Sequence, residues 1–168
     1  MANTRAQFFS RKPSSQIIYT TIELYNPTQG VRRFVTGQQL PKSFQLEPEA
    51  PRDAGQVVEF DAVGFDAPEP EVGEDGLVSM DIQLGAIGFE AKRYMDGVRA
   101  AWPPVIYVVW RQYLQGVDAP QSVLYMQSEA PVIDVINVAL QCSQVNLATR
   151  GPTETYDPDV FKGLQGLI

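Results

Sequence analysis

The chain has 168 residues, of which 44% are hydrophobic and 20% charged, and its formal net charge is −7. This composition excludes an intrinsically disordered protein, and the length predicts one domain with a sizeable core. The sequence contains no histidine and only one cysteine, Cys142. It therefore excludes histidine-dependent catalytic relays, internal disulfides and metal sites built from several cysteines, and we expect Cys142 to be a small buried apolar residue.

The sequence shows no sign of a membrane anchor or a secretion signal. Its most apolar run, residues 105–110, is far shorter than the roughly 20 residues that a membrane helix needs. The first residues contain no apolar stretch long enough for a signal peptide. We expect a soluble protein that is made in a cytoplasm and binds no membrane.

Alternating apolar and polar residues predict strands in the first third of the chain. Residues 17–25 alternate as in a half-buried strand, with Ile22 and Leu24 on one face and Glu23 on the other. Turn residues follow at 26–30, and residues 31–36 are typical of a return strand. A short helix is expected earlier, at residues 3–11.

The middle of the chain alternates strands with loops rich in proline and glycine. Residues 44–46, 57–65 and 77–84 have strand patterns. Residues 48–55 indicate a loop, and prolines and charges in residues 67–76 predict an exposed acidic loop.

The sequence predicts one central helix, at residues 89–101, where apolar residues recur at helical spacing before Trp102-Pro103-Pro104 ends it. Further strands are expected at residues 105–114, 123–127, 132–140 and 145–147. About eight strands with little helix indicate a mainly β fold, a sandwich or a barrel-like sheet. We expect residues 1–148 to form this domain and residues 149–168 to form a C-terminal extension.

Charge is distributed unevenly along the chain. Residues 1–42 carry six basic residues against one acidic residue, a net charge of +5, whereas residues 43–90 carry twelve acidic residues against one basic residue, a net charge of −11. An acidic protein repels the phosphate backbone, so stable binding of nucleic acid is not expected. These regions are either separate solvated faces or surfaces that meet their opposites on a neighbouring copy.

The acidic loop is the one place with a catalytic composition. Its carboxylates belong to Glu69, Glu71, Glu74 and Asp75. They are compatible with a solvated loop, with a cation site or with acid–base catalysis. A loop tip rich in proline and glycine keeps carboxylates in water, which favours the solvated loop and argues against catalysis.

Aromatic residues around the strand at 105–114 allow two interpretations. Trp102, Trp110 and Tyr113 would form a stacking face for a sugar or a protein partner if they were exposed. Aromatic residues at strand spacing more often fill a core, which we favour for Tyr107 and Trp110. For Tyr113 both interpretations stay open.

Six segments, in this order, resemble a family of small tail proteins from long-tailed, non-contractile bacteriophages, including Mu-like phages of Pseudomonas. The segments are YTTIEL (19–24), VRRFV (31–35), FDAVGF (60–65), PEVGEDG (70–76), WRQYL (110–114) and YDPDVFKGL (156–164). The resemblance implies a structural part of the virion at the tail tip, without enzymatic activity and without a cofactor. The alternative is a carbohydrate-binding or receptor-binding module of the tail.

A tail-tip component of this kind is expected to form a ring of three or six copies that joins the tail tube to the hub, near the tape-measure protein. The residues expected at contacts between copies or with these partners are Arg32, Arg33, Glu69, Glu71, Glu74, Asp75, Tyr113, Tyr156, Phe161, Leu164 and Leu167. The extension at residues 149–168 is expected to dock on a neighbour, because it is too apolar for a free tail. The acidic loop is expected to line the central channel, where it would repel DNA.

Overall fold

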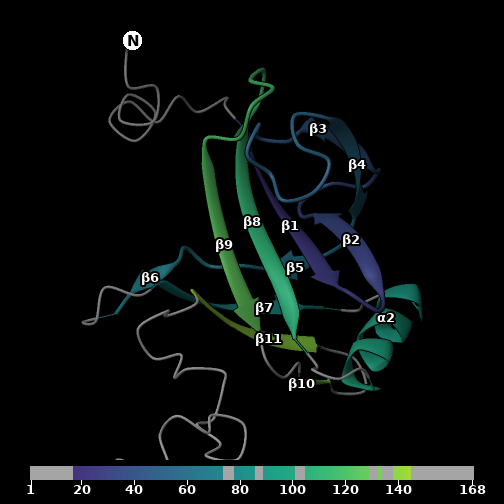
Figure 1. The fold of residues 1–168 in the computed structure, drawn as a ribbon. Coiled ribbons are helices and arrows are strands. Elements are labelled where there is room, and N and C mark those ends of the chain that lie inside the picture. The colour runs from purple at the N-terminus through teal and green to yellow at the C-terminus, as the bar shows by residue number, and fades with distance from the viewer. Residues whose placement is uncertain are drawn as a thin grey trace, which may run out of the picture.

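The computed structural model describes residues 17–73, 78–85, 89–100, 105–128, 132–133 and 138–144, and this part of the chain is mainly β with a single helix, as the sequence predicted (Figure 1). The helix is α2 (Phe89–Ala100). The strands are β1 (Ile18–Asn26), β2 (Gly30–Val35), β3 (Lys42–Gln45), β4 (Val57–Ala62), β5 (Phe65–Asp66), β6 (Glu71–Val72), β7 (Val78–Leu84), β8 (Ile106–Leu114), β9 (Ser122–Ser128), β10 (Val132–Ile133) and β11 (Val138–Ser143).

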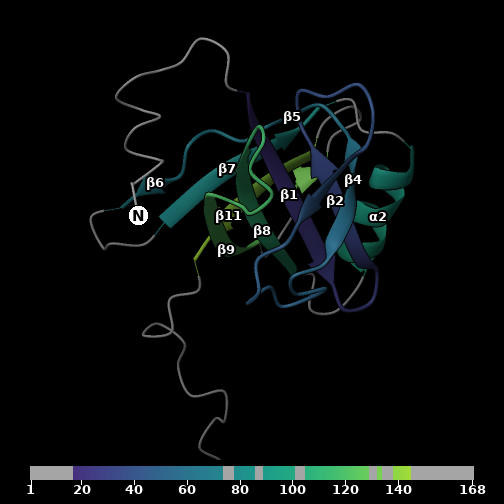
Figure 2. The same cartoon turned by 90° about the horizontal axis from the view of Figure 1, so that it is seen from above.

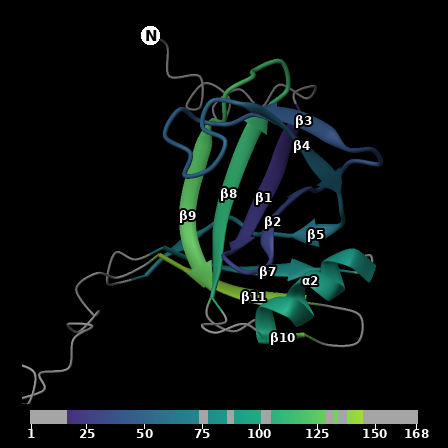
Figure 3. The same ribbon diagram turned by 45° about the vertical axis from the view of Figure 1, so that its right-hand side comes forward.

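All described strands belong to one sheet with the order β3-β4-β2-β1-β8-β9-β11-β7-β5, and β6 and β10 pair at the side with β7 and β11. The long strand β1 lies in the middle and pairs antiparallel with both β2 and β8. The sheet bends, so that β7 and β11 run across β1, β8 and β9 (Figures 2 and 3). This bend encloses the main core.

The β1–β2 hairpin forms at the predicted turn because Asn26 organises it. The Asn26 Oδ1 atom accepts hydrogen bonds from the backbone N–H groups of Thr28 at 2.9 Å and Gln29 at 3.2 Å. The Asn26 side-chain amide donates to the carbonyl of Val105 at 2.9 Å. Gly30 closes the turn at a φ of 77°, in the left-handed region that favours glycine.

Helix α2 begins and ends within one residue of the predicted bounds. It buries Tyr94, Met95 and Val98 in the main core, and these three residues occupy one helical face. Gly97 lets the helix approach the β1–β2 turn closely, since a Cβ at this position would lie 2.5 Å from Gln29 Cδ.

Two apolar clusters lie on opposite faces of β1 and β8. The main core takes alternate residues of these strands, such as Ile22 and Trp110, together with β7, β11 and α2. A smaller core on the other face contains Tyr19, Val35, Phe44, Leu46, Ala50, Phe60 and Tyr113. Strand β1 is therefore buried on both faces, and the expectation that it is half-buried is wrong.

The predicted strand at residues 57–65 divides into two strands with different partners. Strand β4 pairs with β2 and β3, whereas β5 pairs with β7 at the other end of the strand order. The chain crosses between these partners at Val63 and Gly64, where the Val63 N–H donates to Val35 O at 3.1 Å. The two ends of the bent sheet are thus connected by two residues.

Other differences concern strand bounds. Residues 71–72 of the predicted acidic loop form β6, at the edge of the sheet, where neighbouring prolines are tolerated. Within the predicted strand at 132–140, the structure describes β10 and the start of β11. The predicted helix at 3–11, the strand at 145–147 and the extension at 149–168 lie outside the described residues. No helix in the described ranges is long and apolar enough to cross a membrane.

We predict that Phe60→Ala lowers the free energy of unfolding by about 3–5 kcal/mol, because Phe60 is fully buried in the smaller core and its loss leaves a cavity. Its exposed neighbour Glu59 provides the control, and Glu59→Ala should change stability by no more than about 0.5 kcal/mol. Urea denaturation of both variants measures the difference. Equal effects would contradict the assignment of a second core.

Candidate functional site

A cluster of six charged residues covers one end of the smaller core, on the face of β1 and β8 opposite the main core. Its members are Glu23, Arg33, Glu47, Arg52, Asp53 and Arg111. We call this set the charge cluster. Three positive and three negative side chains balance one another, and both Glu23 and Arg111 are completely buried.

Arg111 is the centre of the charge cluster. Its guanidinium donates to both carboxylate oxygens of Glu47, from Nε at 2.7 Å and from Nη2 at 2.9 Å. Its Nη1 atom also donates to Glu23 Oε2 at 3.3 Å. Two-pronged pairing of this kind is among the strongest hydrogen-bonding arrangements of charged side chains. Arg111 therefore joins strand β1 to the loop that carries Glu47.

Glu23 accepts from two further arginines. Arg33 lies directly opposite Glu23 in the β1–β2 pair and donates from Nε at 3.1 Å, while Arg52 donates from Nε at 2.9 Å. Arg33 also pairs with Asp53. Because Glu47, Arg52 and Asp53 all belong to the segment between β3 and β4, the charge cluster fixes this segment over the sheet.

The surroundings shift the pKa values in the charge cluster. Burial raises the pKa of Glu47, but the hydrogen bonds from Arg111 and Tyr125 outweigh burial, and the net pKa is lowered. Burial lowers the pKa of Arg111, whereas its bonds to Glu47 and the charge of Glu23 raise it above its usual value. Burial and the 2.8 Å bond to Glu47 raise the pKa of Tyr125 to about 12. All three groups keep their ordinary charge state at neutral pH.

The sequence did not reveal this cluster. Glu23 alternates with apolar residues and was expected to face solvent. The strand periodicity could have indicated it. Glu23 lies on the same face of its strand as Tyr19, and Arg111 lies on the same face as Tyr113. Both tyrosines are buried in the smaller core. A charged residue in register with buried aromatic residues indicates a buried ion pair.

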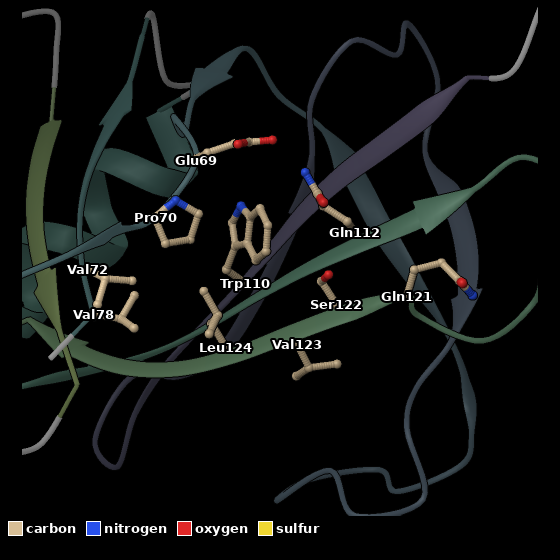
Figure 4. Close-up of a pocket in the computed structure, with 10 residues that line it drawn as sticks. All are labelled: Glu69, Pro70, Val72, Val78, Trp110, Gln112, Gln121, Ser122, Val123 and Leu124. Atoms are coloured by element: carbon tan, nitrogen blue, oxygen red, sulfur yellow. The ribbon is translucent and has the colours of Figure 1, made fainter. Parts of the chain in front are cut away.

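A pocket of about 470 Å³ lies on the other side of the sheet, between β6 and the outer halves of β8 and β9 (Figure 4). Its volume is in the range of ligand-binding pockets. It is lined by Glu69, Pro70, Val72, Val78, Trp110, Gln112, Gln121, Ser122, Val123 and Leu124. We call it the Trp110 pocket.

Two buried polar atoms at the Trp110 pocket have no hydrogen-bond partner within the described part of the chain. They are Nε1 of Trp110, which can only donate, and Oγ of Ser122. Figure 4 shows the Trp110 indole between Pro70 and Gln112, with Glu69 above it and Leu124 below it. Buried donors without acceptors are costly, and they indicate a place where another molecule completes the bonding.

The aromatic stacking face expected from the sequence does not form. Trp110 is 3% exposed and packs in the main core, while Tyr113 is 0% exposed and packs in the smaller core on the opposite face of β8. Their spacing of three residues places them on opposite faces of a strand. The core interpretation is confirmed for Trp110 and wrong for Tyr107, which is exposed beside Tyr25. Trp102 lies outside the described residues.

The expected partner contacts are separated in the structure. Arg32 is exposed and its guanidinium lies 5.7 Å from the centre of the Tyr94 ring, whereas Arg33 is engaged in the charge cluster. Tyr113 is enclosed within its own chain and donates to the carbonyl of Gln45 at 3.0 Å, which corrects the expectation that it contacts a partner.

Glu69 and Glu71 are both exposed, as expected for solvated carboxylates. The other residues expected at contacts are Glu74, Asp75, Tyr156, Phe161, Leu164 and Leu167, which lie outside the described residues. Among the side chains that the structure describes, no group of three or more acidic or cysteine residues could hold a metal ion.

Cys142 is buried in the main core, as predicted. Burial raises the pKa of its thiol to about 12, with a smaller contribution from the charge of Asp81. Because the thiolate is the reactive form, Cys142 is an inert core residue at neutral pH.

Comparison with known proteins assigns the chain to a family. A sequence model of the family described as a domain of unknown function (DUF1833) matches residues 3–150, so the chain belongs to this family. Among curated proteins, none matches the sequence.

We predict that Glu23→Gln lowers the free energy of unfolding by about 3 kcal/mol, because it removes the buried charge that three arginines share. Asp53→Asn is the matched control. It also exchanges a carboxylate for an amide, but the side chain is 43% exposed, so the loss should stay below about 1 kcal/mol. Urea denaturation at neutral pH compares the two. A loss for Asp53→Asn as large as that for Glu23→Gln would show that burial does not govern the charge cluster.

We predict that Glu47 makes stability depend on pH. Its pKa is lower in the folded chain than its usual value of 4.5, so its contribution is complete above that value and is lost as the pH falls through the folded pKa. The difference in urea midpoint between the wild type and Glu47→Gln should be largest at neutral pH and shrink below about pH 4.5. A difference that stays constant down to pH 3 would contradict this assignment.

Proposed function

We propose that this member of the DUF1833 family is a structural component of a bacteriophage tail tip, and that it forms a ring of three or six copies between the tail tube and the hub. It acts by binding to itself and to the tube, hub and tape-measure proteins, and it makes or breaks no covalent bond. The chain is made in the cytoplasm of the host bacterium and is then incorporated into the virion.

The observation that carries this proposal is the projecting edge formed by β6 and the adjoining end of β7. Figure 2 shows these two elements reaching beyond the other strands. Val72, on β6, is 70% exposed there. An apolar side chain and an open strand edge on a projecting element are unfavourable in a free monomer and suit contact with a neighbour.

The rest of the fold provides a rigid support for such contacts. The charge cluster fixes the segment between β3 and β4, and two residues connect the two ends of the bent sheet. A ring subunit transmits force between tube and hub, so its body must keep its shape while its edges bind. The rigid body held by buried charges and the projecting edge together support a role in assembly.

We predict that Val72→Asp greatly reduces incorporation of the protein into phage particles while leaving its stability within about 0.5 kcal/mol of the wild type, because the side chain is exposed. The matched control is Val57→Asp on β4, where the wild-type side chain is 67% exposed. Particles made by the phage that encodes each variant are purified, and the protein is quantified by mass spectrometry.

Wild-type particles should contain the protein in a multiple of three copies, located at the tail tip by electron microscopy. Val57→Asp should be incorporated normally. Absence of the wild-type protein from purified particles would reject the proposed function, and equal loss with both variants would reject the role of the projecting edge.

A further inference from the structure

We propose that the Trp110 pocket binds the basic N-terminal segment, residues 1–16, of a second copy of the chain. This inference rests on the proposed function and adds the contact that joins one subunit to the next. It is carried by three features of the described residues: the acidic surroundings of the pocket, its unpaired buried donor, and the place where β1 leaves the sheet.

The surroundings of the pocket are acidic. A smaller cavity of about 150 Å³ adjoins it, with Glu69 in the lining of both, and Glu71 and Asp81 also line this cavity. All three carboxylates are exposed, and no lysine or arginine among the described residues lines either cavity. None of the ion pairs among the described residues involves them. This surface therefore attracts a cationic partner.

Most basic side chains of the described sheet are engaged elsewhere. Arg33, Arg52 and Arg111 belong to the charge cluster, Arg32 lies on the Tyr94 ring, and the Lys42 ammonium lies 4.0 Å from the centre of the Tyr19 ring. A complementary partner must bring its own positive charge.

The two terminal segments of the chain differ sharply in charge. Residues 1–16 contain Arg5, Arg11 and Lys12 and no acidic residue, a net charge of +3. Residues 145–168 contain two basic and three acidic residues, a net charge of −1. Charge complementarity therefore selects the N-terminal segment over the C-terminal one as the occupant.

The lining of the pocket fits a peptide that carries aromatic and basic residues. Its apolar side, formed by Val72, Val78 and Leu124, is suited to Phe8 or Phe9 of the segment. A backbone carbonyl of the segment would accept a hydrogen bond from Trp110 Nε1, which has no acceptor among the described residues. The side-chain amide of Gln112 both donates and accepts, as a peptide backbone requires.

The direction of β1 assigns the segment to a second copy. Ile17, the first described residue, lies beyond the end of β8, where its carbonyl accepts from Gln115 N–H at 2.9 Å. Trp110 and Gln112 lie opposite Ile22 and Thr20, so β1 runs toward the pocket and its N-terminal end at Ile18, opposite Leu114, points away from it. Docking in a neighbour needs no reversal of the chain, and repeated head-to-tail contacts of this type close into a ring.

The test is a charge exchange in the full-length protein. Arg11→Glu with Lys12→Glu reverses the charge of the segment. Glu69→Lys with Glu71→Lys reverses the charge at the pocket. Each double variant alone should self-associate at least ~10-fold more weakly than the wild type, because like charges then face each other. A mixture of the two double variants should assemble again, since each segment then meets an opposite charge on the other variant. Light scattering and native mass spectrometry measure the assemblies.

The control is Glu59→Lys with Asp61→Lys, the same change of charge on exposed positions of β4, which should leave self-association within about twofold of the wild type. Urea midpoints for all variants check that each one folds. If assembly returned when both reversals were combined in one chain but not in the mixture, the segment would dock in the pocket of its own chain. That result would overturn the inference.

Failure of the inference is distinguishable from failure of the proposed function. Wild-type self-association that none of the reversals weakens, or a wild type that stays monomeric at all concentrations, would overturn the docking of the segment. The proposed function is decided separately, by the presence of the protein at the tail tip of purified particles.

Discussion

The structure depends on the pairing of Arg111 with Glu23 and Glu47. A buried guanidinium is tolerated only when its donors are satisfied, and here two carboxylates from different parts of the chain supply the acceptors. The pairing fixes how the segment between β3 and β4 lies on the sheet, because an apolar contact alone would allow it to slide. Breaking a buried ion pair is costly even where the intact pair adds little net stability, so the pair favours one orientation of the segment over others.

The same central strands serve two purposes through the two faces that they present. One face of β8 contributes Trp110 to the main core and to the pocket, and the other contributes Arg111 to the charge cluster. The buried carboxylates of the charge cluster are paired with arginines, whereas the indole N–H on the other face has no acceptor among the described residues. This difference supports the proposal that a neighbouring subunit binds at the pocket.

The local pattern predicted the strands and the helix well where neighbours along the chain decide the structure. Helix α2 follows from the spacing of Met95 and Val98 and from the prolines after it. The pattern failed where residues distant in the sequence decide the structure. Glu23 is buried because Arg111, 88 residues away, neutralises it, and the strand at 57–65 divides because its ends pair at opposite ends of the sheet. The pocket lining also comes from four separate segments, so no local motif in the sequence predicts it.

The pairing of β1 with β8 has a consequence for biosynthesis. Ile22 lies opposite Trp110, so strand β1 gains this neighbour only after all the residues between them have been synthesised. Until then its apolar side chains are not buried against β8, and contacts so distant in sequence form slowly. We therefore expect the newly made chain to pass through an early state that relies on chaperones, and rapid overproduction to favour aggregates over folded protein.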